Sequence, residues 1–150
     1  VVAAAASVAR HFVARKRAVG FLAYGERREL VQPDRGERQL SKILETLAVV
    51  QASGHVTIDR LLAAEGLSFG RNSMVVVVTP STQTAWVKVL RDLGRRGVDA
   101  IAVVIDPAGF GSRRQAGEVL QALAGAGILA YRVREGESLA SALTTPALPH

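Results

Sequence analysis

The strongest constraint on the fold is a run of five apolar residues, four of them valine, over residues 74–78. Thr79, Pro80 and Ser81 follow it as a polar turn. A strand without polar alternation is typical of a position buried on both faces, at the centre of a parallel sheet with helices on either side. The run therefore predicts a parallel sheet.

The residues after this run continue the same pattern. An amphipathic stretch over about residues 82–96 ends at Gly97, and a second apolar run covers residues 98–105. Strand, helix and strand in this order form the βαβ unit of α/β proteins. Ser112, with Gln115 three residues later, predicts a capping box that starts the next helix.

The first half of the chain predicts helices around an antiparallel hairpin. The first helix has an apolar face at helical spacing and ends at the cations of residues 15–17, which suit a helix C-terminus. Another helix follows over residues 37–52. The expected core face of the first helix is Val1, Ala5, Val8 and Phe12, and the expected strands cover residues 18–24, 28–32, 73–79, 98–105 and 128–133.

The length of 150 residues is that of one ordinary domain, so we expect a single domain over residues 1–150. A short helix over residues 136–143 and a frayed tail over residues 144–150 would end it. Because the chain opens at Val1 with residues typical of a helix interior, we expect a fragment that starts inside a domain.

Composition excludes several kinds of chemistry. The chain has no cysteine, which removes disulfides, thiolate catalysis and zinc–thiolate sites and fits a cytoplasmic location. No apolar run reaches the about 18 residues that a bilayer span needs. The net charge of +6 favours acidic partners without choosing among nucleic acid, lipid head groups and acidic protein.

Several motifs, in their order along the chain, resemble one bacterial family. They are residues 18–24 (AVGFLAY), residues 33–36 (PDRG) with Gln39-Leu40, residues 44–48 (LETLA), residues 78–81 (VTPS) with Trp86, residues 93–97 (LGRRG), Gly127-Ile128 before Tyr131, and Gly136 before Ser138-Leu139. Together they resemble the C-terminal part of the von Willebrand factor A-like family known as domain of unknown function 58, over nearly the whole chain.

The resemblance implies a three-layer α/β/α, Rossmann-like fold with a doubly wound, mostly parallel sheet of order 3-2-1-4-5-6 and one antiparallel edge strand. The first strand and its metal motif would precede Val1. Without that strand, backbone N–H and C=O groups of the flanking strands, residues 19–24 and 74–79, would lack partners. Each buried unpaired group would cost about 1–3 kcal/mol. We expect the gap to be closed by a partner chain such as a second copy, by direct pairing of the flanking strands, or by a segment not included here.

The same resemblance implies a divalent metal, held by a motif after the first strand, a threonine and an aspartate after the fourth strand. Here Thr79 stands where that aspartate is expected. Thr57 could be the metal-binding threonine, but the role of a helix cap is favoured for it. Asp106 is a further candidate ligand. We therefore expect no cofactor, with Mg²⁺ only if the missing motif is supplied.

Two polar loops follow predicted strands, where open α/β sheets bind ligands. In residues 106–112, the glycines and the helix start at Ser112 would suit an anion, although an ordinary loop is favoured. Thr79, Ser81 and Thr82 form a hydroxyl-rich turn that either caps the next helix or rims a partner site. Trp86 is either a core residue or, if exposed, an interface anchor.

No catalytic motif is present, so no catalytic residue and no enzymatic activity are predicted. The three histidines are far apart, and the arginine pairs at residues 27–28, 95–96 and 113–114 fit a solvated surface better than a nucleic-acid site.

We therefore expect a non-enzymatic protein-interaction module. The resemblance implies work beside a MoxR-type AAA+ ATPase in the assembly or maturation of other proteins, within a membrane-anchored parent. The alternative is a domain that binds a small ligand or nucleotide through Thr79–Thr82 and Asp106–Ser112.

Overall fold

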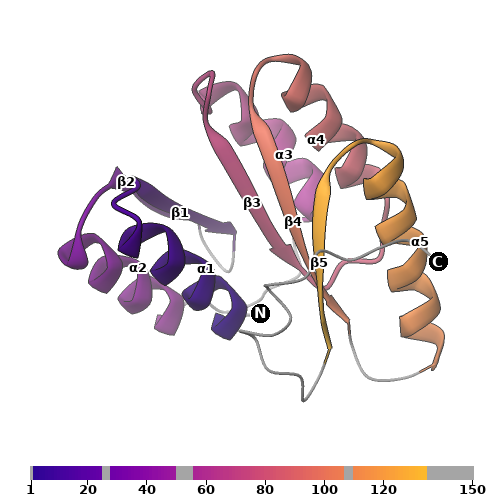
Figure 1. The fold of residues 1–150 in the computed structure, drawn as a ribbon, viewed down its shortest axis with the longest axis horizontal. Coiled ribbons are helices and arrows are strands. Elements are labelled where there is room, and N and C mark those ends of the chain that lie inside the picture. The colour runs from indigo at the N-terminus through magenta and orange to yellow at the C-terminus, as the bar shows by residue number, and fades with distance from the viewer. Residues whose placement is uncertain (1, 25–27, 50–55, 107–109, 135–150) are drawn as a thin grey trace. The chain divides into compact units, whose positions relative to one another are not determined.

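A computed structural model describes residues 2–24, 28–49, 56–106 and 110–134, with the backbone alone for residues 110–115. The chain divides into two compact units, Val1–Thr57 and Ile58–His150. The mixture of helices and strands is confirmed, and Figure 1 shows the elements in order: α1 (Val2–Ala14), β1 (Val19–Tyr24), β2 (Arg28–Asp34), α2 (Glu37–Val49), α3 (Ile58–Glu65), the 3₁₀ turn η1 (Gly66–Ser68), β3 (Met74–Thr79), α4 (Ala85–Arg95), β4 (Asp99–Asp106), α5 (Phe110–Gly125) and β5 (Leu129–Arg134).

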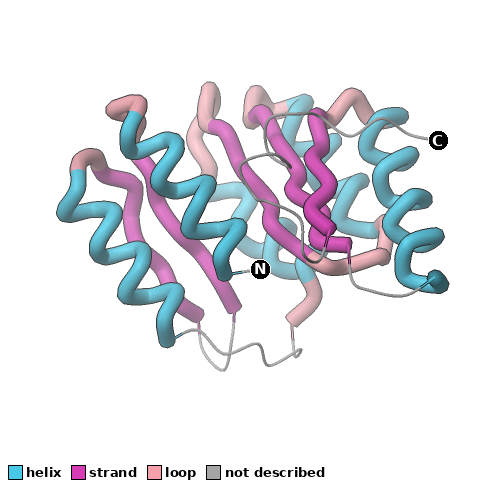
Figure 2. The backbone as a smooth tube through the Cα atoms, turned by 60° about the horizontal axis from the view of Figure 1, so that its bottom comes forward, coloured by secondary structure: helices cyan, strands magenta, loops and turns pink. Residues whose placement is uncertain are grey.

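In the first unit, two helices pack on an antiparallel hairpin. Strands β1 and β2 pair as predicted, and α1 and α2 contact both the hairpin and each other, which places them side by side (Figure 2). Ala9, Ile43 and Leu47 form the centre of the core between them. This small core stabilises the unit through the apolar surface that it removes from water.

The predicted core face of α1 is rotated from the observed one. Ala4, Ala9 and Val13 are the buried residues of α1, whereas Val8 and Phe12 are only partly buried. Val13 is buried while Val8, a side chain of the same size, is only partly buried, so size alone does not decide which positions face the core. Hydrophobic periodicity therefore located the helix but not its innermost stripe.

Gln39 joins α2 to both strands of the hairpin, and no sequence pattern predicted this. Its side chain is buried, and its Nε2 donates to the carbonyl oxygen of Val19 at 2.6 Å and to that of Gln32 at 2.8 Å. The strand register shifts between Val19 and Phe21, at Gly20, where an added Cβ would lie 2.8 Å from a backbone oxygen of β2. The glutamine amide thus satisfies carbonyl groups at an irregular part of the ladder.

The second unit contains a parallel sheet of order β3-β4-β5, and the predicted strands match the observed ones to within about one residue at each end. Helices α4 and α5 pack against the sheet and against each other, so they share one face of it. The register aligns Val77, Ala102 and Ala130 in one row, and all three are buried.

The valine run is not the centre of this sheet. Strand β3 pairs with β4 alone among the described strands, and Val77 is buried while Val76 and Val78 are partly exposed. The central strand is β4, where Ala102, Val103 and Val104 are almost completely buried. An apolar run predicts burial, but it does not specify how many neighbours a strand has.

Two predicted helix caps are wrong. Helix α4 begins at Ala85 after Thr84, whose side chain makes no capping hydrogen bond, so neither Ser81 nor Thr82 caps it. Helix α5 begins at Phe110, which places Ser112 inside the first turn and not at the cap of the predicted box. Both errors arise because the residue types that cap helices, such as serine and threonine, also occur in loops and inside the first turn of a helix.

Three further predictions have different outcomes. The helix over residues 136–143 and the tail over residues 144–150 lie outside the described residues. The described strands form two sheets, β1-β2 and β3-β4-β5, and how the gap left by the missing first strand is closed stays a prediction. In the described part of the chain, no helix combines the length and apolar character needed to cross a membrane.

Candidate functional site

An ion pair lies at the carboxyl end of the second unit's sheet. Asp106, the last residue of β4, has a side chain that is only 2% exposed. Its Oδ2 accepts a hydrogen bond from Arg132 Nε at 2.8 Å and contacts Arg132 Nη2 at 2.6 Å. The register aligns Arg132 with Val104, two residues before Asp106, so both side chains project from the same face of the sheet.

The second carboxylate oxygen of Asp106, Oδ1, is buried and has no hydrogen-bond partner among the described residues. A buried acceptor that stays unpaired costs about 1–3 kcal/mol, so this oxygen favours the approach of a hydrogen-bond donor. The rest of the predicted loop, residues 107–109, and the side chains up to Ser112 lie outside the described part.

The hydroxyl-rich turn after β3 folds back on itself. Thr79 is buried, and its Oγ1 accepts a hydrogen bond from the backbone N–H of Ser81 at 3.0 Å. Ser81 Oγ accepts in turn from the backbone N–H of Gln83 at 3.3 Å. Since Thr79 aligns with Val104, it projects from the same sheet face as Asp106. Thr82, the remaining member of the predicted rim, is partly buried.

Trp86 belongs to the core. Its side chain has no exposed surface, which selects the core role from the two that the sequence left open. Its indole Nε1–H is also buried, and no residue in the described part of the chain accepts a hydrogen bond from it. A partner protein therefore cannot reach this side chain in the conformation described.

The candidate metal ligands do not form a fitting set. Thr57 is exposed and immediately precedes α3, the position expected of a helix cap. Asp106 Oδ2 is already paired with the guanidinium group of Arg132, whose charge opposes a nearby cation. Within the described residues, no three His, Asp or Glu side chains cluster as a metal ion would require.

Arg132 was missed in the sequence because charged residues near strand ends are common at surfaces. The sequence contained one signal for it: Arg132 lies between Tyr131 and Val133, in the middle of a predicted strand whose other central residues are apolar. An arginine at an inward position of a strand usually requires a buried acid.

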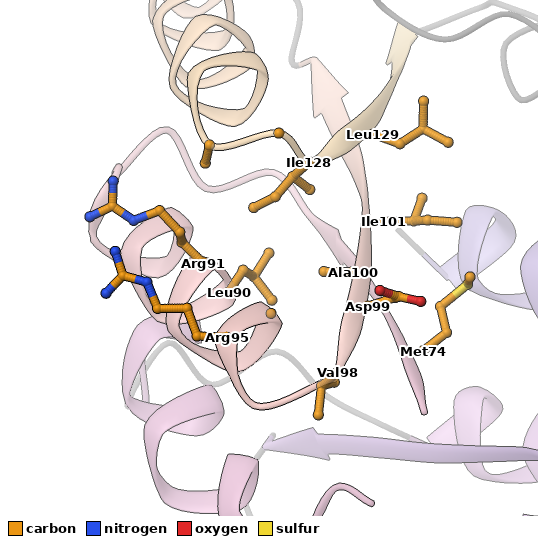
Figure 3. A pocket seen from close by; sticks show the side chains of 13 residues that line it. Met74, Leu90, Arg91, Arg95, Val98, Asp99, Ala100, Ile101, Ile128 and Leu129 are labelled. Carbon is orange, nitrogen blue, oxygen red and sulfur yellow. The ribbon is translucent and has the colours of Figure 1, made fainter. Parts of the chain in front are cut away.

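A second candidate site lies at the amino ends of the strands. A hollow with a volume of about 470 Å³ is lined by residues of β3, β4, β5, the end of α4 and the turn before β5. Figure 3 shows Leu90, Arg91 and Arg95 on one side of β4, with Met74 and Ile101 on the other.

The register explains the hollow. Strand β4 begins its pairing with β3 at Asp99, but its pairing with β5 begins only at Ile101, opposite Leu129. The sheet is therefore narrower at its amino end, and Asp99 and Ala100 extend beyond the start of β5. Met74 and Leu129, which are 43% and 44% exposed, flank this step with apolar side chains.

Cations border the same hollow. Arg91 and Arg95 are one helical turn apart on α4, and their side chains run side by side in Figure 3. Arg95 contacts Asp92 at 3.5 Å in a well-exposed pair, whereas Arg91 has no ion-pair partner among the described residues. Asp99 is the acidic residue in the lining.

Comparisons with known proteins add no relative. A scan against models of protein families found no match, and a search of curated proteins found none.

Proposed function

We propose that this chain is a non-enzymatic protein-interaction module whose docking surface is the hollow at the amino ends of β3, β4 and β5. The observation that supports it is the pair of large apolar side chains, Met74 and Leu129, which stay more than 40% exposed beside a concave surface. Removing such apolar side chains from water stabilises a complex with a partner that covers them.

The sequence resemblance supports the same proposal. It implies a von Willebrand A-like, three-layer fold and a MoxR-type AAA+ ATPase as the partner. The confirmed parallel sheet with α4 and α5 on one face is compatible with that fold without being specific to it. The ATPase is therefore one partner to test against the docking surface.

The test is a selection of binding peptides from a random library on the full chain, followed by measurement of each selected peptide against two variants. Leu129→Asp places a charge at the docking surface. Leu67→Asp is the matched control, since Leu67 is 78% exposed on η1 and does not line the hollow. Peptides that lose binding to the first variant alone support the proposal; equal losses, or no selected peptide, contradict it.

A second candidate function is the binding of a small ligand at the carboxyl ends of β3 and β4. It is favoured by the buried Oδ1 of Asp106, which none of the described residues hydrogen-bonds and which a ligand hydroxyl or amine would satisfy. Thermal unfolding with and without millimolar ATP, Mg²⁺ or Mn²⁺ tests it, since a ligand at about 100 times its Kd adds roughly 2.7 kcal/mol of stability. A shift that Asp106→Asn abolishes would favour this function, and unchanged melting with all three would remove these ligands from consideration.

A further inference from the structure

We infer that the outer edge of β3 accepts an extended segment of a partner protein, which adds a strand to the three described strands of the parallel sheet. The segment is uncharged, rich in β-branched side chains and about as long as Met74–Thr79. This site is separate from the proposed docking surface, because it runs along β3 and shares only Met74 with the lining of the hollow.

Strand β3 has a single partner among the described strands. Each of its residues aligns with a residue of β4, from Met74 with Asp99 to Thr79 with Val104. It forms one edge of the parallel sheet in Figure 1, and no described strand pairs with its other side. The N–H and C=O groups that point away from β4 therefore form a row that a further strand would satisfy.

The other edges of the described sheets have features that discourage pairing. Strand β2 contains Pro33, the ladder of β1 is irregular at Gly20, and β5 carries Arg132 and Arg134. Proline, irregular register and charge are the usual means by which proteins prevent a sheet edge from pairing. All of Met74–Thr79 is described, and this strand has no charge, no proline and no shift in register.

The exposure of the valines shows what an added strand would bury. Val78 is partly exposed, although Val103, its aligned residue on β4, is only 1% exposed. The two side chains project from the same face of the sheet, but Val103 has a strand on both sides and Val78 has one on one side alone. A strand beside β3 would cover Val78 and the partly exposed Val76 from the open side.

The chemistry of the edge selects an extended protein segment. A helix satisfies its backbone groups internally and has none to offer along its length. Lipid head groups and nucleic acids bind through cations, and β3 contains no charged residue. A second copy of this chain brings the same net charge of +6 and is repelled, whereas an uncharged strand is not.

The experiment titrates the full chain with a labelled, end-capped peptide of about eight residues in which valine and threonine alternate. Fluorescence anisotropy measures the Kd, and NMR-detected hydrogen exchange locates the site. Alternate amides of β3 should exchange at least about tenfold more slowly with the peptide bound, while those of β5 stay unchanged. The matched control is the same peptide with every backbone nitrogen methylated, which keeps the side chains and removes the donors. It should bind roughly tenfold more weakly or worse.

A charge on the edge provides a second control, on the protein side. Val76→Lys gives β3 the kind of residue that protects other edges and should weaken peptide binding roughly tenfold. Leu67→Lys adds the same charge at a 78% exposed residue of η1 and should leave the Kd within about twofold. Circular dichroism establishes that both variants are folded.

The outcomes separate this site from the docking surface. Leu129→Asp should bind the peptide as the original chain does, and a loss of binding in that variant would place the peptide in the hollow and overturn the inference. No saturable binding, equal binding of the methylated peptide, or protection of β1 in place of β3 would also overturn it. Protection of β3 that grows with protein concentration in the absence of peptide would identify a second copy as the occupant.

Discussion

Arg132 Nε donates to Asp106 Oδ2 at 2.8 Å, and this bond links the central strand of the parallel sheet to its neighbour. The acid is buried and the arginine side chain is 21% exposed, so the pair is held largely out of water. A pair of this kind adds little net stability, because desolvation offsets the attraction, but the loss of one partner leaves the other charge uncompensated.

Arg132→Met should therefore destabilise the second unit by about 3 kcal/mol, since it leaves the Asp106 carboxylate buried and unpaired. Urea unfolding followed by circular dichroism measures this. The control Arg60→Met removes an exposed arginine from α3 and should cost less than about 0.5 kcal/mol. The double variant Arg132→Met with Asp106→Leu should be more stable than Arg132→Met alone; equal stability would show that the carboxylate is not the source of the loss.

Gln39→Leu should destabilise the first unit. The change keeps a side chain of similar size and removes both donors, which leaves the carbonyl oxygens of Val19 and Gln32 without this partner. The expected cost is about 1–3 kcal/mol. Hydrogen exchange of the amides in β1 and β2 should increase, while that of β4 stays unchanged. Ser41→Ala, at an exposed position of the same helix, is the control. The amides of β1 and β2 should exchange in this variant as slowly as in the original chain.

Trp86→Phe should cost less than its loss of volume suggests. Full burial of Trp86 means that Trp86→Ala removes a large core side chain, at about 3–5 kcal/mol. Phenylalanine keeps most of the packing and also removes the indole N–H, for which the described residues offer no hydrogen-bond acceptor. We expect a loss of less than about half that of the alanine variant in the same unfolding experiment. Losses of equal size would indicate that the indole N–H is satisfied in solution.

The local pattern of the sequence predicted the strands well, because each strand is a short apolar run bounded by glycine or polar residues. It could not predict which strand lies at the centre. Val76 and Val78 look more apolar than Ala100 and Ala102, yet the alanines belong to the central strand β4. Small residues allow close packing with neighbouring elements, so burial depends on tertiary contacts that residue hydrophobicity does not encode.

The candidate sites were predicted less well, for a related reason. Thr79 and Asp106 were identified from their places after apolar runs, and the register puts them on one face. Arg132 was missed because its pairing depends on a residue 26 positions away. The hollow beside Arg91 and Leu129 was also missed, since it arises from the different starting points of β4 and β5, and that stagger is a property of the folded register.

The turns after α4 and α5 offer a paired test of backbone strain and side-chain packing. Gly97 and Gly127 both have positive φ, at 88° and 73°. Each follows a helix that ends in the same way, with Val98 N–H donating to Leu93 and Ile128 N–H donating to Leu123. An alanine in this backbone region costs about 1–2 kcal/mol at either place.

The two positions differ in their surroundings. A Cβ at Gly127 would meet nothing within 4 Å, whereas one at Gly97 would lie 2.9 Å from Arg71 Cγ. Gly97→Ala should therefore destabilise the chain more than Gly127→Ala, because it adds displacement of the Arg71 stem to the backbone cost. Adding Arg71→Ala to Gly97→Ala should remove the difference, and urea unfolding of the four variants, including Arg71→Ala alone, measures it. If the Gly97→Ala and Gly127→Ala losses are equal, the stem of Arg71 does not pack against this turn.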